Sequence, residues 1–190
     1  MEALNLLKKY GDKGYIGEDV TQLQHAFQCA MFAEDDNDLV DSNIKTDFIL
    51  GCLFHDIGHL LCYDNPEMEK MSDLGVMNHE KVGADYLRSL GYNENVCELV
   101  ENHINTKRYL ISTNPDYYNN LSEASKQTFE YQGGKLSNEE VDSFKQNKLF
   151  KYHLKLRTYD DLAKSTESNL IKKIDNMNKK NYYSSFILSI

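Results

Sequence analysis

The sequence predicts an all-α fold, a helical bundle in a single domain, and three observations support this prediction. Only two prolines and ten glycines interrupt the 190 residues. Aliphatic residues recur every three or four positions between charged ones, which is the spacing that places them on one face of a helix. Hydrophobic residues make up 41% and charged residues 27% of the chain, and a chain of this length can bury a core of its own.

Two helices are predicted in the first part of the chain, over residues 1–13 and from about residue 19 to 35. Asp19 or Thr21 is placed to cap the second of them. The loop between the helices carries Tyr15 and Glu18 among three glycines, which make a backbone mobile or sharply turned. Side chains on such a loop lie more often at the surface than in a site, although loops carry many site residues. The acidic residues 34–38 are expected to form a solvated loop.

The most unusual stretch is predicted as one helix over residues 46–62. It is apolar nearly all round, so we expect it in the middle of the bundle. His55 and Asp56 interrupt the apolar run, and His59 follows one turn later. An aspartate within an apolar helix is costly unless something positive pairs with it, so the adjacent histidine and aspartate indicate a metal ion.

The second half of the chain continues with helices that begin at polar caps. Asn78 is expected to cap a helix that starts at His79, after a long loop over residues 63–77, and another helix from Asn93 has His103 in its last turns. Residues 112–120 are predicted to form a polar turn around a proline. Further helices are predicted at residues 122–130, from a capping box that starts at residue 137, and at about 148–163. The polar tail from residue 164 ends in apolar residues that can dock on the domain or on a partner.

Charge and composition exclude several kinds of partner. The net charge of −9 argues against a nucleic-acid surface, because phosphate backbones select basic faces. No apolar run approaches the ~20 residues of a membrane span, and the N-terminal residues lack the charge order of a signal peptide, so we expect a cytoplasmic protein without a membrane partner. The four cysteines lack CxxC spacing and are expected to be reduced packing residues, with a Cys29 thiolate ligand as the alternative. A monomer is expected.

Six candidate metal ligands lie on or beside predicted helices, each on a different one apart from an adjacent histidine–aspartate pair. They are His25, His55, Asp56, His79, His103 and Asp160. Imidazole with carboxylate and without thiolate suits iron, manganese, zinc or nickel better than it suits a closed structural zinc site. A single histidine facing a core is ordinary, so the pattern alone leaves both a metal site and hydrogen-bonded core histidines open.

The same residues resemble a known family. Their order matches the H…HD…D pattern of the HD-domain superfamily, and the two extra histidines between the HD pair and the last aspartate mark its dinuclear members. Longer blocks resemble the PhnZ-type oxygenases, which are mixed-valent di-iron enzymes that cleave the carbon–phosphorus bond of 1-hydroxyphosphonates. These blocks are Gly14–Glu18, Gln22–Ala26, His79–Leu87 and Glu130–Gly134. The resemblance implies an HD-domain oxygenase over residues 1–164, with residues 165–190 as a C-terminal tail outside it.

This resemblance implies a site with two iron ions, Fe(II) and Fe(III). One iron would be bound by His25, His55, Asp56 and Asp160, and the other by Asp56, His79 and His103. Four further residues would surround the phosphonate: His59, Lys107, Ser125 and Arg157. In the family, the tyrosine that corresponds to Tyr15 can occupy an iron position until substrate expels it, and Glu18 would then face the amine of the substrate.

The implied function is O2-dependent oxidative cleavage of a 1-hydroxyphosphonate to a carboxylic acid and phosphate. With 2-amino-1-hydroxyethylphosphonate the acid would be glycine, and N-methylated or shorter hydroxyphosphonates fit equally well. The alternative is a metal-dependent phosphohydrolase of the HD superfamily that acts on a phosphate ester or nucleotide. A non-catalytic HD protein is disfavoured because every ligand position is filled. The expected partners are therefore a small hydroxyphosphonate and O2.

Overall fold

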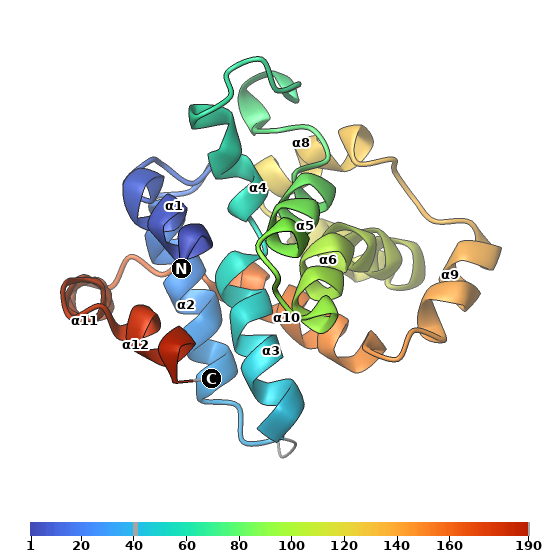
Figure 1. Ribbon diagram of the computed structural model, residues 1–190. Coiled ribbons are helices and arrows are strands. Elements are labelled where there is room, and N and C mark those ends of the chain that lie inside the picture. Colours follow the sequence, from blue (N-terminus) through green and yellow to red (C-terminus); the bar gives the residue numbers. More distant parts are fainter. Residues whose placement is uncertain (40–41, 190) are drawn as a thin grey trace.

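Helix α3 (Ser42–Phe54) lies at the centre of the molecule, between α2 (Gln22–Glu34) and α6 (Glu94–Thr113) (Figure 1). This computed structural model describes residues 1–39 and 42–189. The other helices, in chain order, are α1 (Glu2–Tyr10), α4 (Ile57–Leu60), α5 (His79–Ser89), α7 (Pro115–Asn120), α8 (Glu123–Tyr131), α9 (Asn138–Lys145), α10 (Phe150–Leu162), α11 (Ser168–Lys179) and α12 (Tyr182–Leu188). In these described ranges β structure is confined to isolated bridges, so the predicted all-α, single-domain fold is confirmed.

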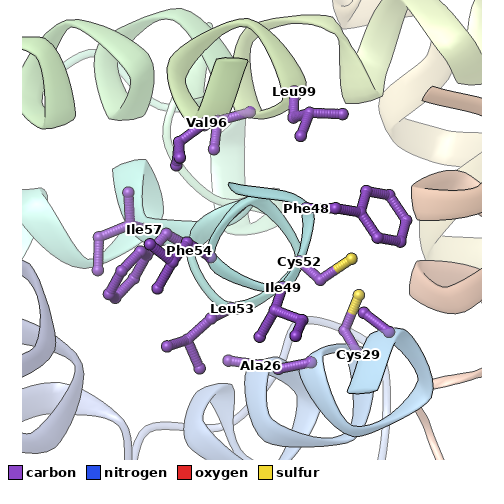
Figure 2. Close-up of a cluster of buried hydrophobic side chains, with 14 of the residues drawn as sticks. Ala26, Cys29, Phe48, Ile49, Cys52, Leu53, Phe54, Ile57, Val96 and Leu99 are labelled. Atoms are coloured by element: carbon purple, nitrogen blue, oxygen red, sulfur yellow. The ribbon is translucent and has the colours of Figure 1, made fainter. Parts of the chain in front are cut away.

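The core forms around α3, as its apolar pattern predicts. Figure 2 shows α3 between α2 and α6, with Ile49 and Leu53 directed to α2. Leu53 lies toward Ala26 of α2, and Val96 and Leu99 approach from α6. Gly51 permits the close approach of α3 and α6, because a Cβ there would lie 2.9 Å from the Cδ1 atom of Leu99.

The predicted continuous helix over residues 46–62 is wrong, because the chain breaks at the His55–Asp56 pair. Helix α3 ends at Phe54, and only the short α4 and a 3₁₀ turn, η1 (Leu61–Tyr63), follow. Asp56 has φ −101° and ψ 11°, outside helical geometry. The Nδ1 atom of His55 bonds the carbonyl of Cys52 at 2.9 Å and so satisfies an end carbonyl of α3. The break turns both side chains into the interior.

The predicted helix starts after Thr21, Asn78, Asn93 and Ser137 are confirmed, although one of them lacks the expected capping hydrogen bond. Thr21, rather than Asp19, caps α2 in a capping box with Gln24, and Ser137 begins α9 in the same way. Asn78 precedes α5 but makes no capping hydrogen bond, because its backbone is left-handed at φ +53°.

The predicted polar turn over residues 112–120 is also wrong. Helix α6 continues to Thr113, and α7 begins at Pro115. A proline at the first position of a helix loses no hydrogen bond, so it is as compatible with a helix start as with a turn. Asn114 caps α7 by accepting a hydrogen bond from the backbone of Asp116 at 3.1 Å. The long α6 thereby carries His103 and Lys107 along one continuous element.

The C-terminal tail docks on the domain, which answers the question that the sequence left open. Figure 1 shows α11 and α12 beside α2. Tyr183 is buried with its ring edge against Phe27, at a centroid distance of 4.8 Å. Lys8 of α1 donates hydrogen bonds to Asn181 at 2.7 Å and to Ser184 at 2.9 Å.

The acidic loop after α2 is not simply solvated. The side chain of Asp36 is almost buried and accepts hydrogen bonds from Lys155 at 2.7 Å and from Tyr159 at 2.6 Å, which ties the loop to α10. The cysteines are free and mostly buried, as expected of packing residues. None of the helices in the described ranges is long and apolar enough to cross a membrane.

Candidate metal centre

Five elements bring the six predicted ligands together. His25 comes from α2, His55 and Asp56 from the break after α3, His79 from the start of α5, His103 from α6 and Asp160 from α10. The four imidazoles and Asp160 are almost inaccessible to solvent. The structure therefore places all six predicted ligands in one cluster.

The histidines form two pairs of facing ring nitrogens. The Nε2 atoms of His25 and His55 are 3.0 Å apart, and those of His79 and His103 are 3.1 Å apart. Backbone carbonyls lie within hydrogen-bond distance of the other nitrogen, Nδ1, in His25, His55 and His103; the carbonyls belong to Ala163, Cys52 and Val100. Because a carbonyl only accepts, Nδ1 carries the proton in these three rings, and Nε2 presents a lone pair to the cluster.

Asp56 lies between the two pairs and directs one oxygen to each. Its Oδ2 atom is 3.3 Å from Nε2 of His55 and 3.6 Å from Nε2 of His25. Its Oδ1 atom is 3.3 Å from Nε2 of His79 and 3.4 Å from Nε2 of His103. Asp160 adds a carboxylate oxygen 3.3 Å from Nε2 of His25. Two ligand groups thus share Asp56.

This donor arrangement fits metal ions. Lone pairs that face each other at 3 Å repel, and a cation between them removes the repulsion. Two nitrogen ligands about 2.1 Å from one ion and at a right angle to each other lie about 3.0 Å apart. Cys29 belongs to neither group, and burial raises the pKa of its thiol well above the usual range, so the thiolate alternative loses its support.

The carboxylates of the cluster are ionised. Burial alone would raise their pKa values, but a positive charge on the His55 ring holds the pKa of Asp56 well below its usual range. Burial opposes that charge, yet Asp56 and Asp160 raise the pKa of His55 well above its usual range. A metal ion bound there would replace that proton. For Asp160, Arg157 and His55 overcome burial in the same way and keep its pKa low. The cluster therefore offers two negative charges to a cation.

A cavity opens onto the cluster. Its volume is about 60 Å³, far below the roughly 300–1,000 Å³ of pockets that take drug-sized ligands. Asp56, Asp160, His79 and His103 form its floor, and residues of the Tyr15 loop, of α8 and of the segment around Lys164 complete its wall. The space suits a small polar molecule beside the cluster.

The glycine-rich loop lies over this cavity. The ring of Tyr15 stacks on His25 at a centroid distance of 3.9 Å. Burial, together with the charges of Asp56 and Asp160, raises the pKa of the Tyr15 hydroxyl well above its usual range. Gly17 has φ +74°, and a Cβ there would lie 2.5 Å from the Cβ of Ala124, so glycine lets the loop pack directly on α8.

His59 is held in a defined tautomer at the edge of the cavity. Its ring stacks on His79 at 3.8 Å, and its Nδ1 atom accepts a hydrogen bond from the backbone of Val76 at 3.0 Å. Burial and the neighbouring His79 lower the pKa of His59 well below its usual range, so the ring is neutral. Its proton is then on Nε2, which makes His59 a hydrogen-bond donor. The long loop before α5 thus has a role, since it fixes this ring.

The two predicted phosphonate cations are Arg157 of α10, which lines the same cavity, and Lys107 of α6. Arg157 contacts Asp160 through Nη1 at 2.7 Å, forms a second ion pair with Asp161, and donates from Nε to the Tyr117 hydroxyl at 2.9 Å. Lys107 donates to Thr128 at 2.9 Å, and burial with the charge of Arg157 lowers its pKa to about 7.

Ser125 and Glu18 also reach the cavity. Ser125 lines it at the start of α8 and lies 3.2 Å from the hydroxyl of Ser122. Glu18 lines it from the loop, and its Oε1 atom accepts a hydrogen bond from Nζ of Lys164 at 2.8 Å. Every residue predicted to surround a substrate therefore lies in the cavity wall or is bonded to a residue of that wall.

Comparison with known proteins identifies the family. Residues 23–178 match the family model of the HD domain. The chain belongs to the HD-domain family. The predicted HD-domain fold is therefore confirmed.

Several relatives of this HD domain carry informative names. The uncharacterized protein L432 of Acanthamoeba polyphaga mimivirus is 42% identical over 172 residues, covering 90% of the chain and 75% of that protein. The [1-hydroxy-2-(trimethylamino)ethyl]phosphonate dioxygenase (glycine-betaine-forming) of Leisingera caerulea is 34% identical over 162 residues, covering 85% and 78%. The hydroxymethylphosphonate dioxygenase of Gimesia maris is 37% identical over 159 residues, covering 84% and 75%. The chain is thus an HD-domain protein with relatives among the phosphonate dioxygenases.

Sequence reasoning missed four polar residues around the site of this HD domain: Tyr117, Thr128, Asp161 and Lys164. Only Asp161 gave a signal, because it lies four residues after Arg157 on one helix. His153 is the one histidine besides His59 that is not among the six predicted ligands, and it belongs to neither ligand group. It is buried against Phe144, and neither of its ring nitrogens has a hydrogen-bond partner within the described residues.

Proposed function

We propose that this protein is a di-iron oxygenase that uses O2 to cleave the carbon–phosphorus bond of a 1-hydroxyphosphonate. The observation that carries the proposal is the position of Asp56, with one oxygen toward each of two imidazole pairs. Two relatives are named as dioxygenases of hydroxyphosphonates, which supports this chemistry over the others open to an HD domain.

We assign one iron to His25, His55, Asp56 and Asp160, and the other to Asp56, His79 and His103. Nitrogen and oxygen donors without sulfur suit iron. The iron pair, when bound, supplies the Lewis acidity and the one-electron chemistry that O2 activation requires. The protein contributes orientation, charge and exclusion of water.

The cationic wall suits a phosphonate dianion. Lys107, with its pKa near 7, gains a full charge when a dianion approaches, because the negative charge stabilises the ammonium. Arg157 is held in a fixed plane by Asp160 and Asp161, so it supports the site mainly through its position and charge. Ser125 and the Nε2–H group of His59 add neutral donors for phosphonate or hydroxyl oxygens.

The loop of Tyr15 and Glu18 acts in this proposal as a lid. Tyr15 covers the His25 side of the cluster and keeps water away until a substrate enters. Its phenol is a weak acid in this buried, negative surrounding, and a nearby cation would favour the phenolate. Displacement of this ring is then the step that couples substrate binding to access of O2.

The reaction balances with O2 as the co-reactant. A 1-hydroxyphosphonate and O2 give a carboxylic acid and phosphate, and the two oxygen atoms of O2 account for the two that the products contain beyond the substrate. The C–P bond breaks, the carbon is oxidised and O2 is reduced. Hydroxymethylphosphonate gives formic acid in this scheme, and 2-amino-1-hydroxyethylphosphonate gives glycine.

Release of phosphate from hydroxyphosphonates tests the proposal. The iron-loaded protein is expected to release phosphate only when O2 is present, with one O2 consumed per phosphate, and to show the EPR signal of a coupled Fe(II)/Fe(III) pair. The competing function is a phosphohydrolase, since the HD domain fits both. Anaerobic hydrolysis of nucleotides or phosphate esters with Mn²⁺ or Mg²⁺, without O2-dependent turnover of any hydroxyphosphonate, would overturn the oxygenase proposal.

A further inference from the structure

Glu18 and Lys164 form an ion pair in the cavity wall, away from the metal ligands. Nζ of Lys164 lies 2.8 Å from Oε1 of Glu18 and 3.4 Å from the hydroxyl of Ser122. Both charged side chains are about four-fifths covered, at 18% exposure each. The pair joins the loop over the cavity to the segment that follows α10.

The ion pair occupies Glu18, the carboxylate to which a cationic ligand in the cavity would bind. Three carboxylates line the cavity among the described residues, and Asp56 and Asp160 belong to the metal cluster. Glu18 is the remaining one, and Lys164 neutralises it. The other device that binds ammonium groups is the face of an aromatic ring, but the ring of Tyr15 is stacked on His25.

We infer that Lys164 is a specificity-determining residue, which makes the cavity select phosphonates with a small uncharged substituent over those that carry an ammonium group. The inference rests on the proposed function and names its substrate class: hydroxymethylphosphonate and similarly uncharged 1-hydroxyphosphonates. An ammonium in the cavity must either displace Lys164 from Glu18 or lie beside a like charge. Either event makes the binding free energy of an ammonium compound less favourable, whereas an uncharged substituent leaves the ion pair intact.

Binding of two non-reacting ligands tests this inference in the metal-loaded protein. Ethylphosphonate and 2-aminoethylphosphonate lack the 1-hydroxyl group and differ only by the amine. The wild-type protein is expected to bind ethylphosphonate more tightly. Lys164→Met keeps an unbranched side chain that is one atom shorter, removes the ammonium group and frees Glu18. In this variant the affinity for 2-aminoethylphosphonate relative to ethylphosphonate should rise on the order of tenfold, the effect of one charge-assisted hydrogen bond.

Two matched variants serve as controls. Lys164→Arg retains the positive charge and is expected to keep the wild-type ratio. Lys172→Met removes an exposed lysine on α11 and should leave the ratio unchanged. A wild-type protein that already prefers 2-aminoethylphosphonate, a ratio that Lys164→Met does not move, or the absence of binding by both ligands would each overturn the inference. If Lys164→Met fails to fold, the preference of the wild-type protein between the two ligands still tests the inference.

The failure of this inference and that of the proposed function are distinguishable. Loss of the proposed function appears as the absence of O2-dependent phosphate release from every hydroxyphosphonate, whereas the ratio of binding constants needs no turnover. If the oxygenase activity holds, the same selectivity is expected in turnover. Hydroxymethylphosphonate should have a higher kcat/KM than 2-amino-1-hydroxyethylphosphonate in the wild type, and Lys164→Met should narrow that gap.

Discussion

The Nδ1 atom of His79 lies 3.6 Å from Oε2 of Glu80, and neither atom has a hydrogen-bond partner among the described residues. The Nδ1 atoms of the other three histidines of the cluster lie against backbone carbonyls, so among the four rings only His79 has a carboxylate beside its Nδ1 atom. A carboxylate behind a metal-bound histidine orients the ring and increases its basicity. In the proposed metal site, Glu80 would take this positioning role behind His79.

We predict that Glu80→Gln weakens metal binding at that group by roughly tenfold or more, because the ring loses its anionic partner. The two metals should then differ more in affinity than in the wild type, and titration with a competing chelator should resolve this difference. Asp142→Asn, at an exposed position on α9, is the control and should bind both metals normally. Equal weakening of both metals would contradict the role of Glu80.

Replacement of Asp56 should affect both metals. Asp56→Ala removes an oxygen from each ligand group, so we expect the iron content to fall from two equivalents toward none. Asp160→Asn alters only the group of His25 and His55 and should retain the other ion. Iron analysis after gel filtration measures both outcomes. A variant at position 56 that keeps one full equivalent of iron would exclude a bridging role.

Gly75 and His59 provide a test of the loop before α5. Gly75 has φ +97°, and a Cβ there would lie 2.5 Å from Cε1 of His59. Gly75→Ala should therefore cost about 1 kcal/mol through backbone strain alone and also displace the His59 ring. We expect KM for the hydroxyphosphonate to rise several-fold. Gly91→Ala is the matched control, since φ is +79° there and the added Cβ meets open space. If both variants have the same KM, His59 does not contact the substrate.

His153 makes the stability of the protein depend on pH. Burial lowers its pKa to about 4, against an ordinary value of 6.5. The unfolded chain therefore binds a proton that the folded protein excludes, so stability is fully present above about pH 6.5 and is lost as the pH falls toward 4. Between pH 7 and pH 5 the loss from this residue is about 2 kcal/mol.

The variant His153→Phe removes this titration and keeps an aromatic ring against Phe144. The difference in free energy of unfolding between pH 7 and pH 5 should be smaller by about 2 kcal/mol in the variant than in the wild type. Urea denaturation at the two pH values measures it. The variant changes no other titrating group. If the difference in free energy of unfolding between the two pH values is the same in both proteins, protonation of His153 does not destabilise the fold.

We predict that Lys107 lowers the stability of the folded protein and strengthens phosphonate binding. Its ammonium is buried with one hydrogen bond, to Thr128, beside the like charge of Arg157. Lys107→Met removes that unfavourable charge, so we expect a higher melting temperature together with weaker phosphonate binding. Thr128→Val, which removes only the partner hydroxyl, should lower rather than raise the melting temperature. Loss of stability in Lys107→Met would contradict this account.

The sequence predicts local structure here better than it predicts contacts between distant segments. Thr21 and Ser137 could be recognised as caps because the capping box is complete within four residues. The break at Asp56 could not be predicted, since the apolar pattern resumes at Ile57 with helical spacing after the His55–Asp56 pair, and only the packed core decides where the backbone turns. Pro115 fits a turn and a helix start equally well.

The same distinction holds for the site. The six candidate ligands could be proposed because a histidine and an aspartate interrupt an apolar run and because their order resembles the H…HD…D pattern of the HD-domain superfamily. Tyr117 and Lys164 could not, because each resembles an ordinary surface residue until the fold brings it to Arg157 or to Glu18. Ion pairs between segments that are distant in the chain leave no local signal.

The ring of His25 is held by the carbonyl of Ala163, and its neighbouring ligand Asp160 comes from the same late helix. A ligand group made from both ends of the chain cannot form during synthesis, because its last members emerge after most of the domain. In the proposed metal site, the ion held by His25 and Asp160 would therefore bind only after α10 has docked, and its binding free energy would stabilise the folded state alone. The lifetime of this protein in the cell should consequently follow the supply of free metal as well as the temperature.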